Sequence, residues 1–220
     1  MKDVGLFIIS FLIGTVMVVG YSIFNKQNFQ QKPTIQNTKQ KQTPTFSIES
    51  PPSESLKGLI ASRSGTLFWE SRIATAPSQL NDNVKIQQGE RLITKDKSSA
   101  TVNFDHVGSI VFLENADLSF IQTLPIDFVV EQKKGTIKYE VSGSTPLSIR
   151  IRNALITKTS GTIQITVTDD DSIISISTVQ GTAQIGFNDL DYVSQVFTLR
   201  EEQVYEYNSD ERTAINTKNK

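Results

Sequence analysis

The side chains of this sequence offer little for catalysis. The chain has no cysteine and a single histidine, His106. The lack of thiols excludes disulfides, thiolate metal sites and cysteine nucleophiles, and one imidazole alone supplies little for acid–base work. No Gly-x-Ser-x-Gly elbow occurs, although Ser64 and Ser160 each precede a Gly-Thr pair. We therefore expect no catalytic residue, no cofactor and no enzymatic activity.

A run of three carboxylates could hold a metal ion. Asp169, Asp170 and Asp171 are adjacent, and calcium prefers clustered carboxylates. The EF-hand spacing is missing, however, and neighbouring side chains of an extended chain point in opposite directions. The run is therefore interpreted as a solvated hairpin turn, and His106 as a surface residue in the turn of residues 105–109. No metal site is predicted.

Three residues are candidates for binding. Arg150 and Arg152 alternate with isoleucines, so a strand would place both guanidinium groups on one face, where they could bind an anionic glycan or a partner's carboxylate. A solvated face without a ligand is the alternative. Trp69 is the only tryptophan and, if exposed, could stack on a sugar ring or anchor a partner. Its alternation with Leu67 favours a place in the core instead.

The elements that carry these residues are predicted to be β-strands. Residues 163–167, 174–176 and 183–187 alternate apolar and polar side chains, with many β-branched residues, which is typical of a half-buried sheet. Turn signals recur at roughly 8–12-residue intervals, and no stretch after Gly58 has a convincing helical period. We predict an all-β sandwich or roll over residues 58–208.

A short motif recurs in this region. Gly-Thr pairs begin at Gly65, Gly135, Gly161 and Gly181, and each is followed by an alternating stretch. Their unequal spacing excludes a fixed-period repeat. Glycine permits a positive φ angle, and the β-branched threonine suits the start of a strand. Each pair is therefore expected to form a tight corner that lets the sheet wind into successive layers.

The N-terminal region is predicted to anchor the chain in a membrane. Residues 4–24 are apolar and uncharged, and as a helix they would span about 31 Å, the thickness of a bilayer core. A cleaved signal peptide is the alternative, but its apolar region is usually shorter and small residues usually follow it. Ser10 and Gly14 have the small-xxx-small spacing that lets two such helices approach, which would give a homodimer.

The segments on either side of the β-domain are predicted to be disordered. Residues 25–57 contain four of the seven prolines, no glycine and many Gln, Ser and Thr residues, a composition that cannot bury enough surface to order itself. They would form a linker, a spacer through a surface layer or a glycosylated stalk. Residues 209–220 are interpreted as a disordered polar tail.

The order of turns and strands resembles a known family. A glycine–acid turn at Gly89-Glu90 precedes the strand 92–94, the turn 98–99, the strand 100–104 and the turn 105–109, and residues 128–137, 147–156 and 160–185 continue the series. This order is similar to that of FecR domains, the extracytoplasmic β-domains of bacterial regulators. The end of the domain resembles the family's last strand pair, with Glu201 or Glu202 where a glycine is common.

The resemblance implies a binding role in the bacterial cell envelope. FecR regulators hold a sigma factor with a cytoplasmic N-terminal segment, and here only three residues precede the predicted helix, so that role is not expected. We predict a membrane-anchored, non-catalytic domain that binds or scaffolds an envelope protein or a glycan, with signalling as one form of that role. The net charge of −1, with mixed charges, argues against nucleic acid as a partner.

Two questions stay open at this level. Four lysines follow the predicted helix and one precedes it, which would favour a cytoplasmic β-domain. The FecR resemblance implies an extracytoplasmic β-domain instead, and this is the location we expect.

Two rival functions remain. One is a glycan-binding or glycan-hydrolysing envelope protein, which would need an exposed Trp69 or two carboxyl groups about 5–9 Å apart. The other is a minor pilin-like subunit. Pilins carry a glutamate where Ser10 stands.

Overall fold

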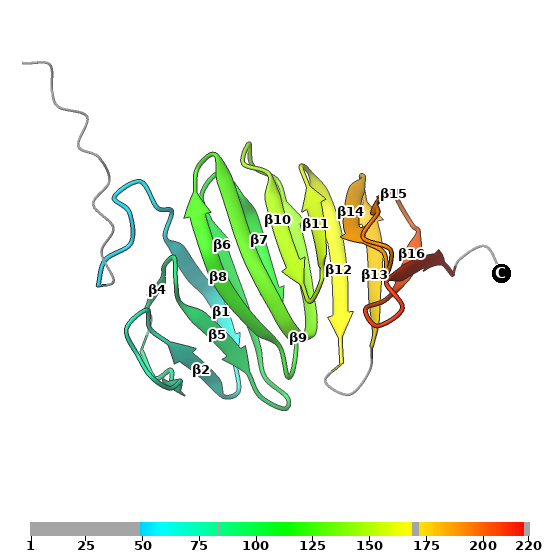
Figure 1. The fold of residues 1–220 in the computed structure, drawn as a ribbon. Coiled ribbons are helices and arrows are strands. Elements are labelled where there is room, and N and C mark those ends of the chain that lie inside the picture. The colour runs from blue at the N-terminus through cyan, green and yellow to red at the C-terminus, as the bar shows by residue number, and fades with distance from the viewer. Residues whose placement is uncertain (1–48, 83, 169–171, 218–220) are drawn as a thin grey trace, which may run out of the picture. The chain divides into compact units, whose positions relative to one another are not determined.

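The protein is represented by a computed structural model, which describes residues 49–82, 84–168 and 172–217 (Figure 1). These residues form strands joined by turns, with no helix, so the predicted all-β fold is confirmed for this part of the chain. The strands are β1 (Gly58–Ser64), β2 (Leu67–Glu70), β3 (Ser78–Gln79), β4 (Lys85–Ile86), β5 (Arg91–Thr94), β6 (Ser99–Phe104), β7 (Gly108–Phe112), β8 (Asp117–Leu124), β9 (Asp127–Val141), β10 (Leu147–Ile151), β11 (Ala154–Lys158), β12 (Gly161–Val167), β13 (Ile173–Gln180), β14 (Ala183–Asn188), β15 (Ser194–Leu199), β16 (Val204–Asn208) and β17 (Thr213–Asn216).

The strands form two open sheets that share one strand. Sheet A has the order β4-β1-β6-β7-β9-β12-β13-β16-β17. Sheet B has the order β3-β2-β5-β8-β9-β10-β11-β14-β15. Every pair is antiparallel except β9 with β10. Because neither row of strands closes on itself, β4, β17, β3 and β15 are edge strands.

The shared strand β9 bends from one sheet into the other at Gly135. Residues up to Lys134 pair within sheet B, and residues from Gly135 onward pair within sheet A. Gly135 has a φ of +79°, and a Cβ atom there would lie 2.3 Å from the Cα of Ala116. Only glycine fits such a corner, because it combines a left-handed backbone with a close backbone approach.

The other Gly-Thr pairs lie at corresponding positions. Gly65, Gly161 and Gly181 all have positive φ, and each stands where the chain leaves one sheet for the other: between β1 and β2, β11 and β12, and β13 and β14. The predicted role of these pairs as corners is therefore confirmed. From β10 onward, successive hairpins alternate between the sheets: β10–β11, β12–β13, β14–β15 and β16–β17.

The core lies between the inner faces of the two sheets. Phe104 of sheet A packs against Phe120 and Phe128 of sheet B, with ring centroids 5.4 and 4.7 Å apart. Phe187 of sheet B packs against Tyr207 of sheet A at 4.8 Å. Between these aromatic groups the buried residues are mainly isoleucine, valine and leucine on alternating strand positions. The period-two pattern of the sequence therefore builds the core directly.

One buried polar network supports the bend in β9. Gln132 is almost fully buried, and its Nε2 donates to the carbonyl oxygens of Gly135 and Ile165, at 2.9 and 3.1 Å. The hydroxyl of Tyr139 donates to Gln132 Oε1 at 2.9 Å, and burial raises the pKa of this tyrosine well above its ordinary value. All polar atoms of the Gln132 side chain thus find partners where two sheets diverge, as a buried network requires.

One predicted boundary needs correction. The polar tail was expected to begin at residue 209, but β17 lies within it and pairs with β16. Ala214 of β17 packs against the core, which explains why this short polar segment is ordered.

The described ranges contain no helix long and apolar enough to cross a membrane. The predicted membrane helix of residues 4–24, and most of the predicted linker of residues 25–57, lie outside these ranges. At the end of the linker, the amide of Leu56 donates to the carbonyl of Thr123 at 2.6 Å. The chain is thus attached to β8 just before β1 begins at Gly58.

Candidate binding surface

The outer face of sheet B carries one continuous row of side chains. The pairing registers place residues of eight strands opposite one another across this face. From β2 to β15 they are Glu70, Arg91, Ser119, Glu131, Arg150, Leu155, Gly186 and Val196. None of them is buried. The row starts with closely paired charges and ends with a shallow hollow, so its two halves suit different roles.

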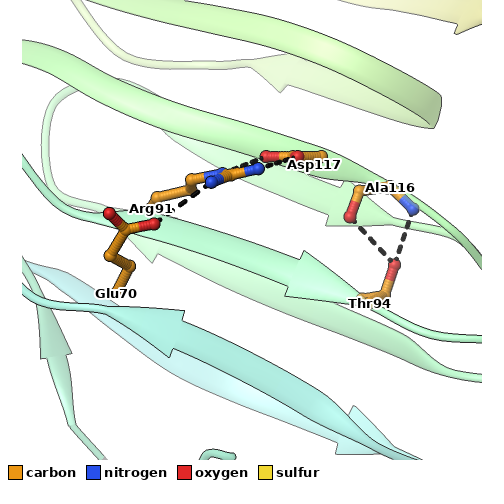
Figure 2. Close-up of polar contacts among 5 residues, drawn as sticks. All are labelled: Glu70, Arg91, Thr94, Ala116 and Asp117. Atoms are coloured by element: carbon orange, nitrogen blue, oxygen red, sulfur yellow. Dashed lines mark hydrogen bonds and ion pairs between the residues drawn. The ribbon is translucent and has the colours of Figure 1, made fainter. Parts of the chain in front are cut away.

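In the first half, Arg91 links three strands through ion pairs (Figure 2). Its Nε and Nη2 donate to the two carboxylate oxygens of Asp117, at 2.7 and 2.5 Å, and its Nη1 lies 3.1 Å from Glu70 Oε2. The hydrogen bonds to Asp117 raise the pKa of Arg91 above its already high ordinary value, so the guanidinium stays charged. The side chain of Asp117 is only 5% exposed, and this two-pronged pairing satisfies it.

The hydroxyl group of Thr94, on β5, contacts the turn that leads into β8 (Figure 2). Thr94 Oγ1 accepts from the amide of Ala116 at 2.9 Å and donates to the carbonyl of Leu113 at 2.5 Å. It therefore satisfies backbone groups at the turn that leads into β8, where the ladder begins. The side chains of Glu70, Arg91, Asp117 and Thr94 thus hold β2, β5 and β8 together, and we assign them a structural role.

The second half of the row forms an open groove over β10, β11, β14 and β15. The groove has a volume of about 580 Å³ and is lined by Glu131, Arg150, Leu155, Gly186 and Val196, among others. Leu155 and Val196 are 43% and 66% exposed. Two apolar side chains thus flank a hollow, and the charged groups of its lining are Glu131, Arg150 and Arg152. This combination can bind an extended segment that carries one acidic and one small apolar side chain.

The two candidate arginines both line this groove, but they differ in setting. Arg150 lies on β10, is exposed, and makes no ion pair or hydrogen bond to any residue within the described ranges. The sequence predicted that Arg152 would share a strand face with Arg150, and this is wrong. Arg152 lies in the β10–β11 turn with a φ of +50°. Its Nη1 donates to Ser209 Oγ at 2.7 Å and its Nη2 to the carbonyl of Thr168 at 3.2 Å.

Gly186 forms the floor of the groove without any backbone need for glycine. Its φ is not positive, and the nearest atoms to a Cβ there would be 3.9–4.0 Å away, which is ordinary contact. Glycine in a strand interior normally weakens the strand and marks a place where a ligand or another backbone approaches. The hollow at Gly186 is therefore the feature of this face that its fold does not explain.

Trp69 lies outside the groove, on β2. It is half-buried and packs against the core, and its Nε1 donates to Glu90 Oε2 at 3.0 Å. The same oxygen accepts from the amide of Gln87 at 2.9 Å. The indole N–H is thus engaged by Glu90, and the ring packs against the core.

The sequence did not predict three buried charged groups: Glu90, Asp117 and Lys158. Lys158 donates through Nζ to the carbonyl oxygens of Gln180 and Thr182, at 2.8 and 3.1 Å, and burial lowers its pKa. Glu90 stands in the glycine–acid turn on which the family resemblance partly rests, and that turn was the available signal for it. No local pattern marks Asp117 or Lys158.

Glu90 should give the protein a specific pH dependence. Burial raises the pKa of Glu90 above its ordinary value of 4.5, although the bonds from Trp69 and Gln87 oppose the shift. The folded state therefore binds this proton more tightly than the unfolded state. The stability contribution of Glu90 is expected to fall as the pH rises from about 4.5 through the folded-state pKa and to level off above it.

Urea unfolding from about pH 4.5 to about pH 7.5 tests this expectation by comparing the wild type with Glu90→Gln. The glutamine keeps an oxygen acceptor but cannot titrate. The free energy of unfolding of the wild type should therefore fall relative to that of Glu90→Gln as the pH rises. Glu54→Gln, at an exposed glutamate, should leave the slope unchanged. Parallel curves for the wild type and Glu90→Gln would contradict the assignment.

The described residues include no group of three His, Asp or Glu side chains that could hold a metal ion. The predicted acidic hairpin turn of residues 169–171 lies outside the described ranges. His106 is exposed in the β6–β7 turn with a φ of +66°, where no acid–base partner reaches it among the described side chains.

The fold and the surface define an open, two-sheet all-β domain with a groove on one outer face. No family model matches the chain, and no curated protein matches it. Two solved structures, each described as a "putative anti-sigma factor from Parabacteroides distasonis ATCC 8503", are similar to part of it. The first is 12% identical, with a TM-score of 0.49 over 58% of each chain. The second is 13% identical, with a TM-score of 0.38 over 57% of this chain and 53% of the other. The match thus spans just over half of either protein.

Proposed function

We propose that this protein is a membrane-anchored, FecR-like envelope protein that binds another protein through the groove on the outer face of sheet B and performs no catalysis. The observation that carries the proposal is the hollow at Gly186, where a strand glycine lies between two exposed apolar side chains and no atom lies closer than 3.9 Å to its Cβ position. The guanidinium of Arg150, unpartnered among the described residues, lines the groove and would pair with an acidic side chain of the partner.

The geometry favours a protein partner over a glycan. A sugar ring would stack on an exposed aromatic face. The indole of Trp69 packs against the core and bonds Glu90. The exposed ring of Tyr192 is not part of the groove lining and has the guanidinium of Arg212 over it, 5.8 Å from the ring centroid. Glycan hydrolysis would need two free carboxyl groups, whereas Glu70 and Asp117 both pair with the guanidinium of Arg91 between them (Figure 2). A polypeptide needs only the apolar walls and the cation.

Membrane anchoring and the extracytoplasmic location belong to the same proposal. The uncharged run of residues 4–24 supports the anchor, and the order of turns and corners supports the FecR-like assignment. Protease treatment of intact cells tests the location. The β-domain is expected to be digested together with surface-exposed controls, and a β-domain that survives while those controls are cut would contradict its exposure at the cell surface.

The binding role can be tested by filling the groove. Gly186→Val adds a side chain to the hollow, and because nothing lies closer than 3.9 Å to its Cβ position, the fold should be retained. A photo-crosslinking amino acid at Leu155 should give a defined adduct in the cells that produce the protein. Gly186→Val and Arg150→Glu should each reduce that adduct by about tenfold or more.

The control is the same photo-crosslinker at Leu113, which is 41% exposed and lies outside the groove. It should give no adduct of the same mass. Equal adducts at Leu113 and Leu155, or an adduct that Gly186→Val leaves unchanged, would contradict the proposed groove. Turnover of a substrate that depends on one acid or on His106 would contradict the absence of catalysis.

A further inference from the structure

The edge strand β15 lacks the features that usually protect an edge from pairing with another strand. It ends sheet B, pairs only with β14, and has the sequence Ser-Gln-Val-Phe-Thr-Leu. This stretch contains no charge, no proline, no glycine and no bulge. Proteins normally protect such edges with lysine, proline, a bulge or a very short strand. An unprotected edge of six β-prone residues offers its backbone groups to another strand.

The hairpin geometry shows which backbone groups are free. The amide of Asp189 donates to the carbonyl of Val193 at 3.0 Å, which closes the β14–β15 hairpin. Hydrogen-bonded pairs alternate along an antiparallel ladder, so Gln195, Phe197 and Leu199 bond to β14. The amides and carbonyls of Ser194, Val196 and Thr198 therefore point away from the sheet, and Val196 is 66% exposed.

The other three edges of the described domain are short. β3 and β4 have two residues each, and β4 includes a lysine. β17 has four residues. β15 is thus the longest edge strand among the described residues. Among these edges, β15 combines the greatest length with a lack of protective features, which points to pairing at β15.

We propose that β15 pairs antiparallel with β15 of a second copy of this chain, joining the two B sheets across a twofold axis. The strand is complementary to itself in the register that places Val196 opposite Val196 and Ser194 opposite Thr198. In that register all the free backbone groups of β15 are satisfied, by about six hydrogen bonds. Because the strand carries no charge, self-pairing brings no like charges together.

The side chains fit this register on both faces. On the outer face two valines meet at the axis, flanked by Ser–Thr pairs, which are favourable cross-strand neighbours. On the inner face Gln195 lies opposite Phe197, which is half-buried and stacked on Phe187 at 5.8 Å. Arg200 of one copy lies opposite Tyr192 of the other, while Glu201 is directed toward the amide of Gly181, 3.4 Å away.

The predicted association is weak in solution. A six-residue strand pair is smaller than the roughly 800 Å² per partner of a standard interface. Two copies attached to one membrane would have a higher effective concentration, which favours such a pair. The pairing rests on the backbone edge of β15 and not on the groove, although Val196 belongs to both. Gly186→Val adds a side chain to the face of the sheet, near Val196 Cγ2, and leaves the free amides and carbonyls of β15 untouched. It should therefore leave self-association unchanged, so the two proposals can fail separately.

Disulfide trapping tests the register, because the full chain has no cysteine of its own. In the purified 220-residue chain, Val196→Cys should crosslink to itself under mild oxidation, since the two Cα atoms at the axis would be about 5.5 Å apart. Thr198→Cys alone should not, because the two positions would be about 13 Å apart along the strands. A mixture of Ser194→Cys and Thr198→Cys chains should crosslink.

Sedimentation of two further variants tests the association itself. Val196→Lys places two ammonium groups at the axis and should weaken self-association at least about tenfold, whereas Val196→Thr keeps the shape and should not. Both changes are at an exposed position, so folding, checked by circular dichroism, should be retained. Equal crosslinking of Val196→Cys and Thr198→Cys, or a wild type that stays monomeric and uncrosslinked at every concentration, would overturn the proposal.

Discussion

Replacing Gly135 with valine is expected to abolish the stable fold of the β-domain. Gly135 has a φ of +79°, which costs a β-branched residue about 1–2 kcal/mol or more. The added Cβ would also lie 2.3 Å from the Cα of Ala116 and 2.4 Å from the carbonyl oxygen of Asn115. Both contacts are with backbone, which cannot move aside without separating the sheets. We expect a loss of about 4 kcal/mol or more in the free energy of unfolding.

Chemical denaturation followed by circular dichroism measures this effect. Gly186→Ala is the matched control, because it removes another strand glycine whose Cβ position is open. That change should be neutral or should stabilise the domain by about 0.5–1 kcal/mol, since alanine has less backbone entropy to lose. If Gly135→Val unfolded at the same denaturant concentration as the wild type, β9 could not bend at this residue.

Replacing Arg91 with methionine should cause the second largest loss. The change leaves the carboxylate of Asp117 almost buried and without its two charged hydrogen bonds. Removing one partner of a buried ion pair typically costs about 3–5 kcal/mol. Because the side chain of Arg91 is 28% exposed and water can partly replace it, we expect about 2–4 kcal/mol in this case.

Two controls distinguish the effect of leaving the carboxylate of Asp117 unpaired from the effect of removing an arginine side chain. Arg150→Met removes an exposed arginine from the same row and should change the free energy of unfolding by less than about 0.5 kcal/mol. The double variant Arg91→Met with Asp117→Asn removes the charge as well and should regain a large part of the loss. If the double variant were as unstable as Arg91→Met alone, the unpaired carboxylate would not be the cause.

The local features of the fold could be read from the chain itself. Alternating side chains predicted the strands of residues 163–167 and 183–187, and the Gly-Thr pairs predicted corners at Gly135, Gly161 and Gly181, all of which the structure contains. These predictions succeeded because the alternation of a strand and the φ freedom of glycine are properties of a few consecutive residues. Three other sheet crossings place non-glycine residues, Lys97, Asn115 and Glu202, at positive φ, which no local rule predicts.

The positions and partners of the charged side chains depend instead on pairing between strands that are distant in the sequence. Arg91 meets Asp117 because β5 pairs with β8, and Trp69 meets Glu90 because β2 pairs with β5. Arg152 was placed on a strand face by its spacing from Arg150, but the β10–β11 turn begins one residue earlier than that pattern implies. Burial of an acid depends on which strands cover it, and period-two spacing carries no such information.

The amino-acid sequence by itself determined the local structure and composition of this domain: its strands, its corners, a core without thiols and the absence of a second histidine. Only the tertiary structure decided which strand lies at an edge, which glycine faces a hollow and which carboxylate is buried. The physical reason is range. Side-chain alternation and backbone sterics act within one strand, whereas edges, grooves and buried charges exist only after strands far apart in the chain have paired.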